Sequence, residues 1–471
     1  MTASPLPQGS YRLVALIVAS AFFMEQLDST IIATALPAMA ESLGADPVRM
    51  NFAMTAYVLS LAVFIPLSGK VADRFGTRNT FRAAIALFVL SSILCGLAQN
   101  LPWLIGARLL QGASGALMVP VGRLVLLRSV EKSQLVAAMS WVLFPAMVGP
   151  AIGPLIGGFL TTYLSWHWIF YINVPIGLAG IVMVTRHIPN VPSDGPTAPL
   201  DYIGFVLSGA CLASLVVGLE NLGHGGARST AFLLLAAAAG CAALYRWHSR
   251  RHPAPLLDFS LMRIPTFHVA LTGGLLYRVA YGGFPFLMPL MLQLGFGLSA
   301  AESGAITFAS AVGGLVMKAI SRPFLRAFGY RNVLIWNGLL SATMLALCGA
   351  FRPSWSVVAI YLLLLIGGFV RSLHMNAYGT IVYADIPQAR MSAATALASI
   401  NQQISMALGV GLSALVLDLS RYALGHEQVQ LSDFSVAFVA MGLLGVVAVG
   451  LCRRLPGDAG AEMSGHRGKR V

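Results

Sequence analysis

The chain alternates between long apolar segments and short polar or charged ones. About 20 consecutive apolar residues are enough for a helix to cross the hydrocarbon core of a bilayer. Turn residues and charges divide the sequence into fourteen such segments. We therefore predict fourteen membrane-spanning helices, at 13–36, 52–68, 83–97, 101–127, 136–164, 168–184, 202–219, 230–245, 267–292, 303–320, 333–350, 357–378, 393–417 and 436–451.

The composition supports a membrane location. Of the 471 residues, 57% are hydrophobic and only 10% are charged, whereas soluble proteins carry roughly 25% charged residues. The five cysteines follow no metal-binding or disulfide spacing. The first apolar segment is too long for a signal peptide, so we expect it to be retained as a span. Together these features predict an all-α integral membrane protein.

The lysines and arginines predict the orientation of the spans. If the N-terminus is cytoplasmic, most cations fall in the termini or in loops after even-numbered spans, as Lys70, Arg250 and Arg326 do. This asymmetry follows the positive-inside rule, so we predict that both termini are cytoplasmic. The net charge of +13 then reports topology and not nucleic-acid binding. The opposite loops hold only Arg49, Arg228, Arg352 and Arg421.

A short repeat indicates two related halves. FGTRN at 75–79 and FGYRN at 328–332 match at four of five positions. Each follows the second helix of a six-helix block, as expected for duplicated halves. The predicted domains are an N-terminal six-helix bundle (1–187), a linker with two inserted transmembrane helices (188–265), a C-terminal six-helix bundle (266–455) and a basic cytoplasmic tail (456–471).

The segment GKVADRFGTR at 69–78 is a charged turn between spans 2 and 3. Glycine at position 69 would let the helix end approach a neighbour, and Asp73 can form a charge network with nearby arginines. A loop that only follows the positive-inside rule would also contain such arginines. The candidate conformational latch consists of Gly69, Asp73, Arg74, Gly76 and Arg78.

Span 5 contains a glycine repeat, GPAIGPLIGG at 149–158. Glycine at every fourth position leaves one bare helix face against which another helix can pack closely. A proline inside a span removes a backbone hydrogen bond and permits a bend. Generic packing of small residues is the alternative interpretation. The candidate antiporter hinge consists of Gly149, Gly153, Pro154, Gly157 and Gly158.

These motifs resemble those of the major facilitator superfamily. The segment 69–78 resembles its loop motif between helices 2 and 3, and the span 5 glycines resemble the antiporter motif of its drug exporters. LDSTIIATALP at 27–37 resembles the first-span motif of drug:proton antiporters. WHWIFYINVPIG at 166–177 and LDYIG at 200–204 resemble the fourteen-span DHA2 (EmrB/QacA-type) branch, which includes MdtD-like multidrug resistance members.

The resemblance implies a fold of two six-helix bundles plus two extra helices, working by alternating access. It implies proton-coupled export of small molecules, as in multidrug efflux, across a bacterial inner membrane. The expected partners are a small-molecule substrate, protons and the lipid bilayer, with no nucleic acid and no cofactor, and the expected state is a monomer. The absence of a GxxxxGK(S/T) loop argues against ATP-driven transport. Scattered histidines without a catalytic cluster argue against an enzyme.

Charged residues inside the spans concentrate on four helices. Both acids, Glu25 and Asp28, lie in span 1, and the cations lie in spans 4, 9 and 12, apart from Lys318 in span 10. The resemblance implies that spans 1, 4, 9 and 12 line a central cavity, where buried charges can face water or one another. The candidate cavity residues are Arg123, Arg278, Arg371, His374, Gln26, Gln111, Tyr277, Tyr281 and Asn376.

Asp28 and Arg108 are predicted to lie at the same depth in the membrane and therefore to form a pair. Asp28 lies eight residues before the outer end of span 1, and Arg108 lies seven after the outer start of span 4. Both are therefore about 10–12 Å below the outer surface. Contact with Arg108 would keep Asp28 ionised, and loss of the contact would favour its protonation. We hypothesise that Asp28 is the main proton carrier and that Arg108 modulates it; a static structural ion pair is the alternative.

Glu25 lies one turn from Asp28 on the same helix face. It is a candidate for a second proton site, a substrate contact or a partner of Arg123 or Arg278. With Asp28 paired to Arg108, the remaining arginines of the cavity outnumber Glu25. Because arginine binds carboxylates with two parallel hydrogen bonds, an exporter of organic anions or carboxylate metabolites is the alternative function. A non-transporting sensor or a channel with the same fold is more remote.

Overall fold

The computed structural model is helical and contains no strand in the residues that it describes, which are 10–130, 135–189, 201–223, 228–252, 257, 259–387 and 390–464. Thirteen stretches of this part of the chain are long and apolar enough to cross a membrane. The helix α7 (Leu135–Tyr163) has 29 residues and no charged side chain, and it corresponds to the remaining predicted span. The all-α prediction is confirmed, and every predicted span corresponds to helical structure.

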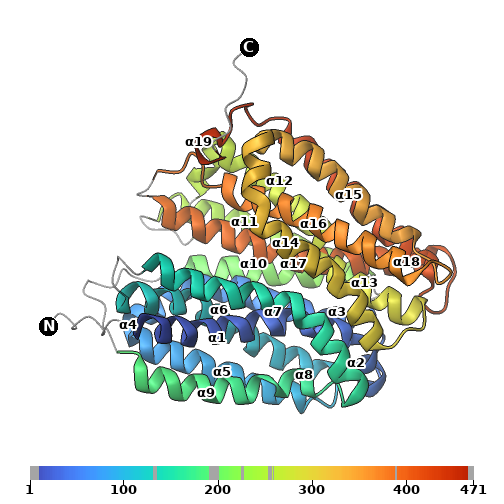
Figure 1. The fold of residues 1–471 in the computed structure, drawn as a ribbon, viewed down its shortest axis with the longest axis horizontal. Helices are drawn as coiled ribbons and strands as arrows, with labels where there is room; N and C mark the ends of the chain where they lie inside the picture. The colour runs from blue at the N-terminus through green and yellow to red at the C-terminus, as the bar shows by residue number, and fades with distance from the viewer. Residues whose placement is uncertain are drawn as a thin grey trace. The chain divides into compact units, whose positions relative to one another are not determined.

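The helices group into two units, Met1–Phe205 and Val206–Val471. Buried side chains from seven helices of the first unit, among them Phe22, Phe88 and Val121, form one apolar core. Figure 1 shows α1 and α7 side by side in this unit. In chain order the unit contains α1 (Ser10–Ile31), η1 (Ile32–Thr34), α2 (Leu36–Leu43), α3 (Asn51–Phe64), η2 (Ile65–Leu67), α4 (Ser68–Phe75), α5 (Thr77–Gly96), α6 (Leu101–Ser129), α7, α8 (Trp168–Tyr171) and α9 (Asn173–His187), and α10 (Tyr202–Gly223) begins at its end.

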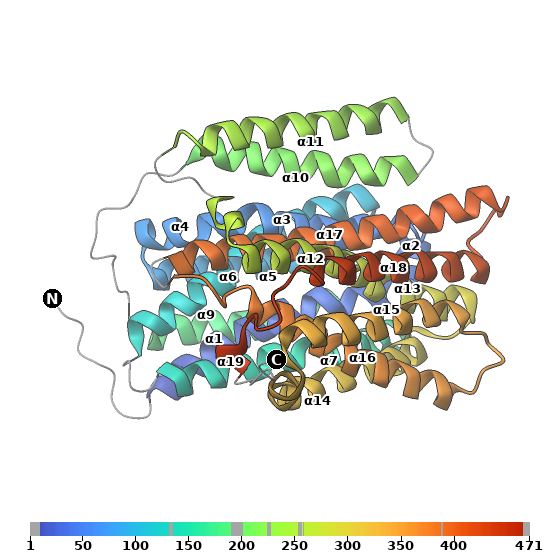
Figure 2. The same cartoon turned by 90° about the horizontal axis from the view of Figure 1, so that it is seen from above.

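The second unit contains the rest of α10 and the helices that follow. The helices α10 and α11 lie side by side (Figure 2), and Gly218 of α10 faces Leu235 of α11. In chain order the other helices are α11 (Arg228–Ser249), η3 (Phe259–Arg263), α12 (Pro265–Gly282), α13 (Phe284–Leu290), η4 (Met291–Gly295), α14 (Ala300–Asn332), η5 (Val333–Asn337), α15 (Gly338–Leu347), η6 (Cys348–Ala350), α16 (Val357–Ile381), α17 (Met391–Ala423), α18 (Leu431–Cys452) and α19 (Ala461–Ser464).

The predicted domain boundaries stay predictions. The first unit ends at Phe205, after the predicted end of the N-terminal bundle at 187. Residues 190–200 of the predicted linker and residues 465–471 of the predicted tail lie outside the described residues.

The helices contain more acidic residues than the predicted spans. The helix α17 continues beyond the predicted end at 417 and therefore includes Asp418, which pairs with Arg421 at 3.1 Å one turn later. Glu302 and Asp433 lie in the first turns of α14 and α18, where each completes a capping box. The prediction that only Glu25 and Asp28 are acids within the spans is thus wrong. The helices extend past the apolar segments, and the acids in these extensions are stabilised by helix capping or by an ion pair.

The two copies of the FG(T/Y)RN repeat adopt the same unusual backbone conformation. Gly76, between α4 and α5, has φ 82° and ψ 148°. Gly329, which interrupts α14, has φ 72° and ψ 161°. This region of backbone conformation is open essentially only to glycine. The shared conformation supports the interpretation that the halves are duplicated, and it gives both glycines a defined structural role.

Replacing either glycine by alanine is expected to destabilise the protein. We expect Gly76→Ala and Gly329→Ala each to lower the free energy of unfolding by about 1–3 kcal/mol, because a Cβ is strained at these backbone angles. Thermal unfolding of the detergent-solubilised protein measures the effect. The matched control is Gly69→Ala, since this position in α4 has open space around it and alanine favours a helix. Equal melting temperatures for all three variants would contradict the expectation.

Candidate functional site

Two acids and an arginine are buried inside the first unit. Glu25 and Asp28 of α1 are 3% and 1% exposed, and Arg108 of α6 is 1% exposed. Ionisable side chains are costly to bury unless they pair and are fully hydrogen-bonded. Their partners therefore determine what this site can do.

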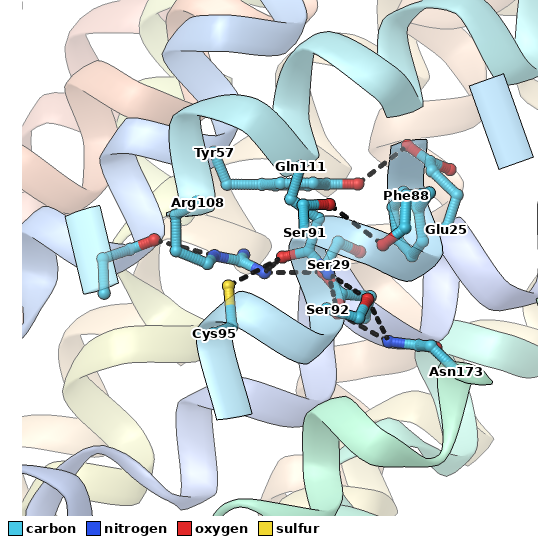
Figure 3. A network of polar contacts seen from close by, with 12 residues as sticks. Glu25, Ser29, Tyr57, Phe88, Ser91, Ser92, Cys95, Arg108, Gln111 and Asn173 are labelled. Atoms are coloured by element: carbon cyan, nitrogen blue, oxygen red, sulfur yellow. Dashed lines mark hydrogen bonds and ion pairs between the residues drawn. The ribbon is translucent and has the colours of Figure 1, made fainter. Parts of the chain in front are cut away.

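Asp28 and Arg108 form the contact that their depths predicted. Arg108 Nη1 lies 2.6 Å from Asp28 Oδ2. The other carboxylate oxygen, Oδ1, accepts hydrogen bonds from Gln111 Nε2 at 2.9 Å and from Asn173 Nδ2 at 3.0 Å. Figure 3 shows Arg108, Gln111 and Asn173 within one network of polar contacts. Asp28 is thus held by donors from two further helices, α6 and α9.

Arg108 has other partners besides Asp28. Its Nε donates to the backbone oxygen of Ala53 at 3.0 Å, and its Nη1 also donates to Gln111 Oε1 at 2.6 Å. The guanidinium carbon lies 4.2 Å from the centre of the Tyr57 ring, in the range of a cation–π contact. The charge of Arg108 is therefore stabilised even when Asp28 is neutral.

Three polar residues that hold the ion pair were missed as site residues. Besides Asn173, these are Ser92 of α5 and Tyr57 of α3. Ser92 Oγ accepts from Gln111 Nε2 at 2.8 Å and from Asn173 Nδ2 at 3.4 Å. Asn173 lies in the quoted WHWIFYINVPIG motif, where a lone amide in an apolar segment could have identified it. For Tyr57 and Ser92 the sequence gives no comparable indication, because only the folded structure brings these residues close to the Asp28–Arg108 pair.

Glu25 is linked to the same site through Tyr57. Its Oε1 accepts from the Tyr57 hydroxyl at 3.5 Å, and its Oε2 accepts from Gln26 Nε2 at 2.6 Å. Arg123 is exposed and forms no ion pair with Glu25 in the described part of the chain. The structure shows no direct contact between Glu25 and Arg123, because Glu25 points to a phenol and an amide, so pairing with Arg123 stays a prediction. Pairing with Arg278 stays a prediction.

The glycine face of α7 packs on the segment of α1 that carries Asp28. A Cβ at Gly153 or Gly157 would lie closer than 3.0 Å to an atom of α1, so only glycine permits this approach. Pro154 is half-buried beside them and Gly158 is buried. The close contact is thus observed, while its use as a hinge stays a prediction. The nearest atoms are Leu27 N (3.2 Å) for Gly149, Thr30 Oγ1 for Gly153 and Ile31 O for Gly157.

The two arginines of the predicted latch do not pair with Asp73 in this conformation. Arg74 is exposed against the ring of Phe75, and Arg78 belongs to the helix after the Gly76 turn. Neither arginine forms an ion pair within the described residues. A Cβ at Gly69 would find no heavy atom of the described chain within 4 Å, so close packing at this glycine is also a wrong prediction. A latch role in another conformation stays a prediction.

Several predicted cavity residues of the second unit form a packed cluster instead. His374 and Tyr277 are 0% exposed and their rings are 4.0 Å apart. The hydroxyls of Tyr277 and Tyr281 both contact Ser341, at 2.5 Å to its Oγ and its backbone oxygen respectively. These three side chains do not form an open wall in this structure, because α15 packs over them. Gln111 is likewise fully buried, in the Asp28 network.

The remaining predicted cavity residues are accessible to different degrees. Arg278, Arg371, Asn376 and Gln26 are half-buried. The guanidinium carbon of Arg371 lies 5.6 Å from the centre of the Phe284 ring and 6.0 Å from that of Tyr281. Neither Arg278 nor Arg371 forms an ion pair in the described part of the chain. The second unit therefore presents uncompensated positive charge on α12 and α16.

Comparison with known proteins establishes the family. The sequence profile of the Major Facilitator Superfamily matches residues 18–410. A crystal structure of a D-xylose-proton symporter superposes with a TM-score of 0.66 at 15% identity, covering 95% of this chain and 98% of that one. The chain therefore belongs to the major facilitator superfamily: it is a multi-pass membrane transporter with the fold of that family, and not an enzyme.

Its curated relatives define the branch more narrowly. The multidrug resistance protein MdtD of Serratia proteamaculans (strain 568) is 38% identical over 454 residues, which cover 94% of this chain and 93% of the relative. MdtD of Cronobacter sakazakii (strain ATCC BAA-894) is also 38% identical, over 462 residues and 96% of each chain. The predicted resemblance to MdtD-like members is thus confirmed.

Proposed function

We propose that this transporter exports small molecules in exchange for protons, by alternating access. The observation that carries the proposal is the buried Asp28–Arg108 pair, which joins α1 to α6 and is held by donors from α6 and α9. A buried ion pair is weak evidence for stability, because well-packed apolar residues are often equally stable. A buried ion pair inside a transporter is therefore better explained by a role in transport.

The pair can couple protonation to conformation. Contact with Arg108 favours the ionised carboxylate of Asp28, and if a helix movement separates them, a dry Asp28 favours the protonated form. Because Arg108 keeps its contacts with Ala53, Gln111 and Tyr57, it tolerates the loss of Asp28 as a partner. Two arrangements of the same residues thus differ by one proton, as coupling to a proton gradient requires. Glu25, joined through Tyr57, is a second candidate site.

The direction of transport is supported by similarity. The curated relatives are named multidrug resistance proteins, which is consistent with export from the cytoplasm. The glycine contact between α7 and α1 acts directly on the helix that carries Asp28, so a bend of α7 would move the proposed proton carrier. We further propose a bacterial inner-membrane location, cytoplasmic termini and a monomeric working state.

Proteoliposomes with an imposed pH gradient test this function. Concentrative accumulation of a substrate that requires the gradient is the expected result. A channel would allow only equilibration, and a non-transporting sensor would allow no flux. Accumulation that persists without any gradient would contradict proton coupling.

Organic anions are a second candidate substrate class. In the second unit, Arg278 and Arg371 have no acidic partner among the described residues. We expect aromatic carboxylates to compete with a transported substrate at lower concentrations than quaternary ammonium dyes of similar size do, by about tenfold or more, because a charge-assisted contact is worth roughly 1.5–3 kcal/mol. Counter-transport assays with both series measure this. Preference for the dyes would reject the anion hypothesis.

A further inference from the structure

A pocket of about 80 Å³ lies within the second unit, between α12, α16 and α17. Its polar walls come from Arg278 of α12, Tyr378 of α16, Tyr383 just after that helix, and Ser399 and Gln402 of α17. Ala270, Leu271, Val382 and Ala398 are among its apolar lining residues. The pocket therefore combines one cation with several hydroxyl and amide groups.

Four of these polar side chains have no partner in the described chain. Arg278, Tyr383, Ser399 and Gln402 make no side-chain hydrogen bond or ion pair with any described residue. Tyr378 differs, because its hydroxyl contacts Cys452 Sγ at 2.9 Å. A guanidinium has five N–H donors, and a phenol, a hydroxyl and an amide add further donors. So many unused donors around one small volume indicate a site for an acceptor that the protein itself does not supply.

Among the described residues of the second unit, no acid forms an ion pair with Arg278. Asp418 lies on α17, but 19 residues after Ser399, and it pairs with Arg421; this places it about 28 Å further along the helix. Asp385 is exposed and accepts a hydrogen bond from Thr266 Oγ1 at 2.7 Å. The charge of Arg278 is thus available to a ligand.

The backbone of α12 makes room for this arginine. A Cβ at Gly274, one turn before Arg278, would lie 3.0 Å from its Nη1. The guanidinium therefore folds back along its own helix beside Tyr378, which also borders the pocket. A defined position is what two-point recognition of a planar anion needs.

We propose that this pocket binds the carboxylate group of a transported substrate, with Arg278 as its main contact and Tyr383, Ser399 and Gln402 as additional donors. The proposal rests on the proposed transport function and specifies its substrate class. A single guanidinium matches the one negative charge of a carboxylate, whereas a phosphate monoester would leave excess charge. The pocket lies where α16 ends and α17 begins, which the predicted topology places at the cytoplasmic end, where an exporter collects its substrate.

Equilibrium binding tests the site without requiring transport. Isothermal titration of the full-length protein in nanodiscs would use benzoate, its neutral analogue benzamide and the cation benzylammonium as probes. We expect benzoate to bind at least about tenfold more tightly than either analogue. We expect Arg278→Gln to remove this preference, and Arg278→Lys to keep part of it, because lysine retains the charge but loses the planar fork.

The matched control is Lys318→Gln, which removes one positive charge from the same unit at a position outside the pocket. It should leave benzoate binding unchanged. If Arg278→Gln fails to fold, Tyr383→Phe and Gln402→Ala should still weaken benzoate binding several-fold. Equal binding of benzoate and benzamide, or equal losses in Arg278→Gln and Lys318→Gln, would overturn the proposal.

Nanodiscs of two compositions separate a soluble anion from a lipid headgroup. With purely zwitterionic lipid and with added anionic phosphatidylglycerol, benzoate affinity should be the same. Competition by the anionic lipid would assign the pocket to a lipid headgroup and overturn the substrate assignment. Because none of these measurements needs a proton gradient, a protein that binds benzoate but shows no gradient-driven flux would reject the proposed coupling and leave the pocket assignment intact.

Discussion

Asp28→Asn is expected to abolish gradient-driven transport while leaving the protein folded. Asparagine cannot carry a proton, but its oxygen can still accept a hydrogen bond from Arg108. Arg108 also keeps its bonds to Ala53 O and Gln111 Oε1. We expect substrate accumulation in proteoliposomes with a pH gradient to fall to the level of protein-free liposomes, while the variant still folds.

Asp418→Asn is the matched control for this variant, because Asp418 is another buried carboxylate that pairs with an arginine. It should transport normally. Glu25→Gln tests Glu25, the second candidate proton site. If Glu25 is only an auxiliary site, this variant should transport more slowly, and its transport should still depend on the gradient. Full gradient-driven accumulation by Asp28→Asn would reject Asp28 as the proton carrier and leave it as a static structural partner.

Arg108→Leu is expected to destabilise the protein strongly. It removes the buried counter-charge of Asp28 and leaves the Ala53 and Gln111 oxygens without the donor they have in the native protein. Breaking a buried pair by removing one partner costs about 3–5 kcal/mol. Equilibrium unfolding in detergent micelles measures this loss. The exposed Arg123 on the same helix provides the control, since Arg123→Leu should cost less than about 0.5 kcal/mol.

The double variant Asp28→Asn, Arg108→Leu shows how much of this cost comes from the unpaired charge. With no carboxylate left behind, it should be more stable than Arg108→Leu alone by about 1–2 kcal/mol. Simple addition of the two single effects would mean that Asp28 and Arg108 are not energetically coupled, despite the 2.6 Å contact.

Much of the fold and part of the site could be predicted from the sequence. Apolar segment lengths locate the membrane helices because the bilayer fixes how many residues are needed to cross it. The Asp28–Arg108 contact was predictable because charges inside a membrane are costly and these two, at equal depth, have few other possible partners. The FG(T/Y)RN repeat similarly anticipated the matching turns at Gly76 and Gly329.

The rest depended on lateral packing, which depth along a helix does not specify. Asn173 reaches Asp28 only because α9 packs beside α1, and Ser92 reaches Gln111 and Asn173 only because α5 packs beside α6 and α9. His374 was expected to face a cavity, but α15 packs over it, and Gly338 leaves just enough room for its ring. Which side of a polar helix faces water is decided by its neighbours, and that information is spread over the whole chain.

Substrate-induced proton release tests the central claim most directly. In a weakly buffered detergent solution with a pH-sensitive dye, adding a transported substrate should release protons from the wild-type protein, because substrate and proton favour different arrangements of the Asp28–Arg108 pair. Asp28→Asn should bind the same substrate and release none. Undiminished proton release from Asp28→Asn would contradict the account.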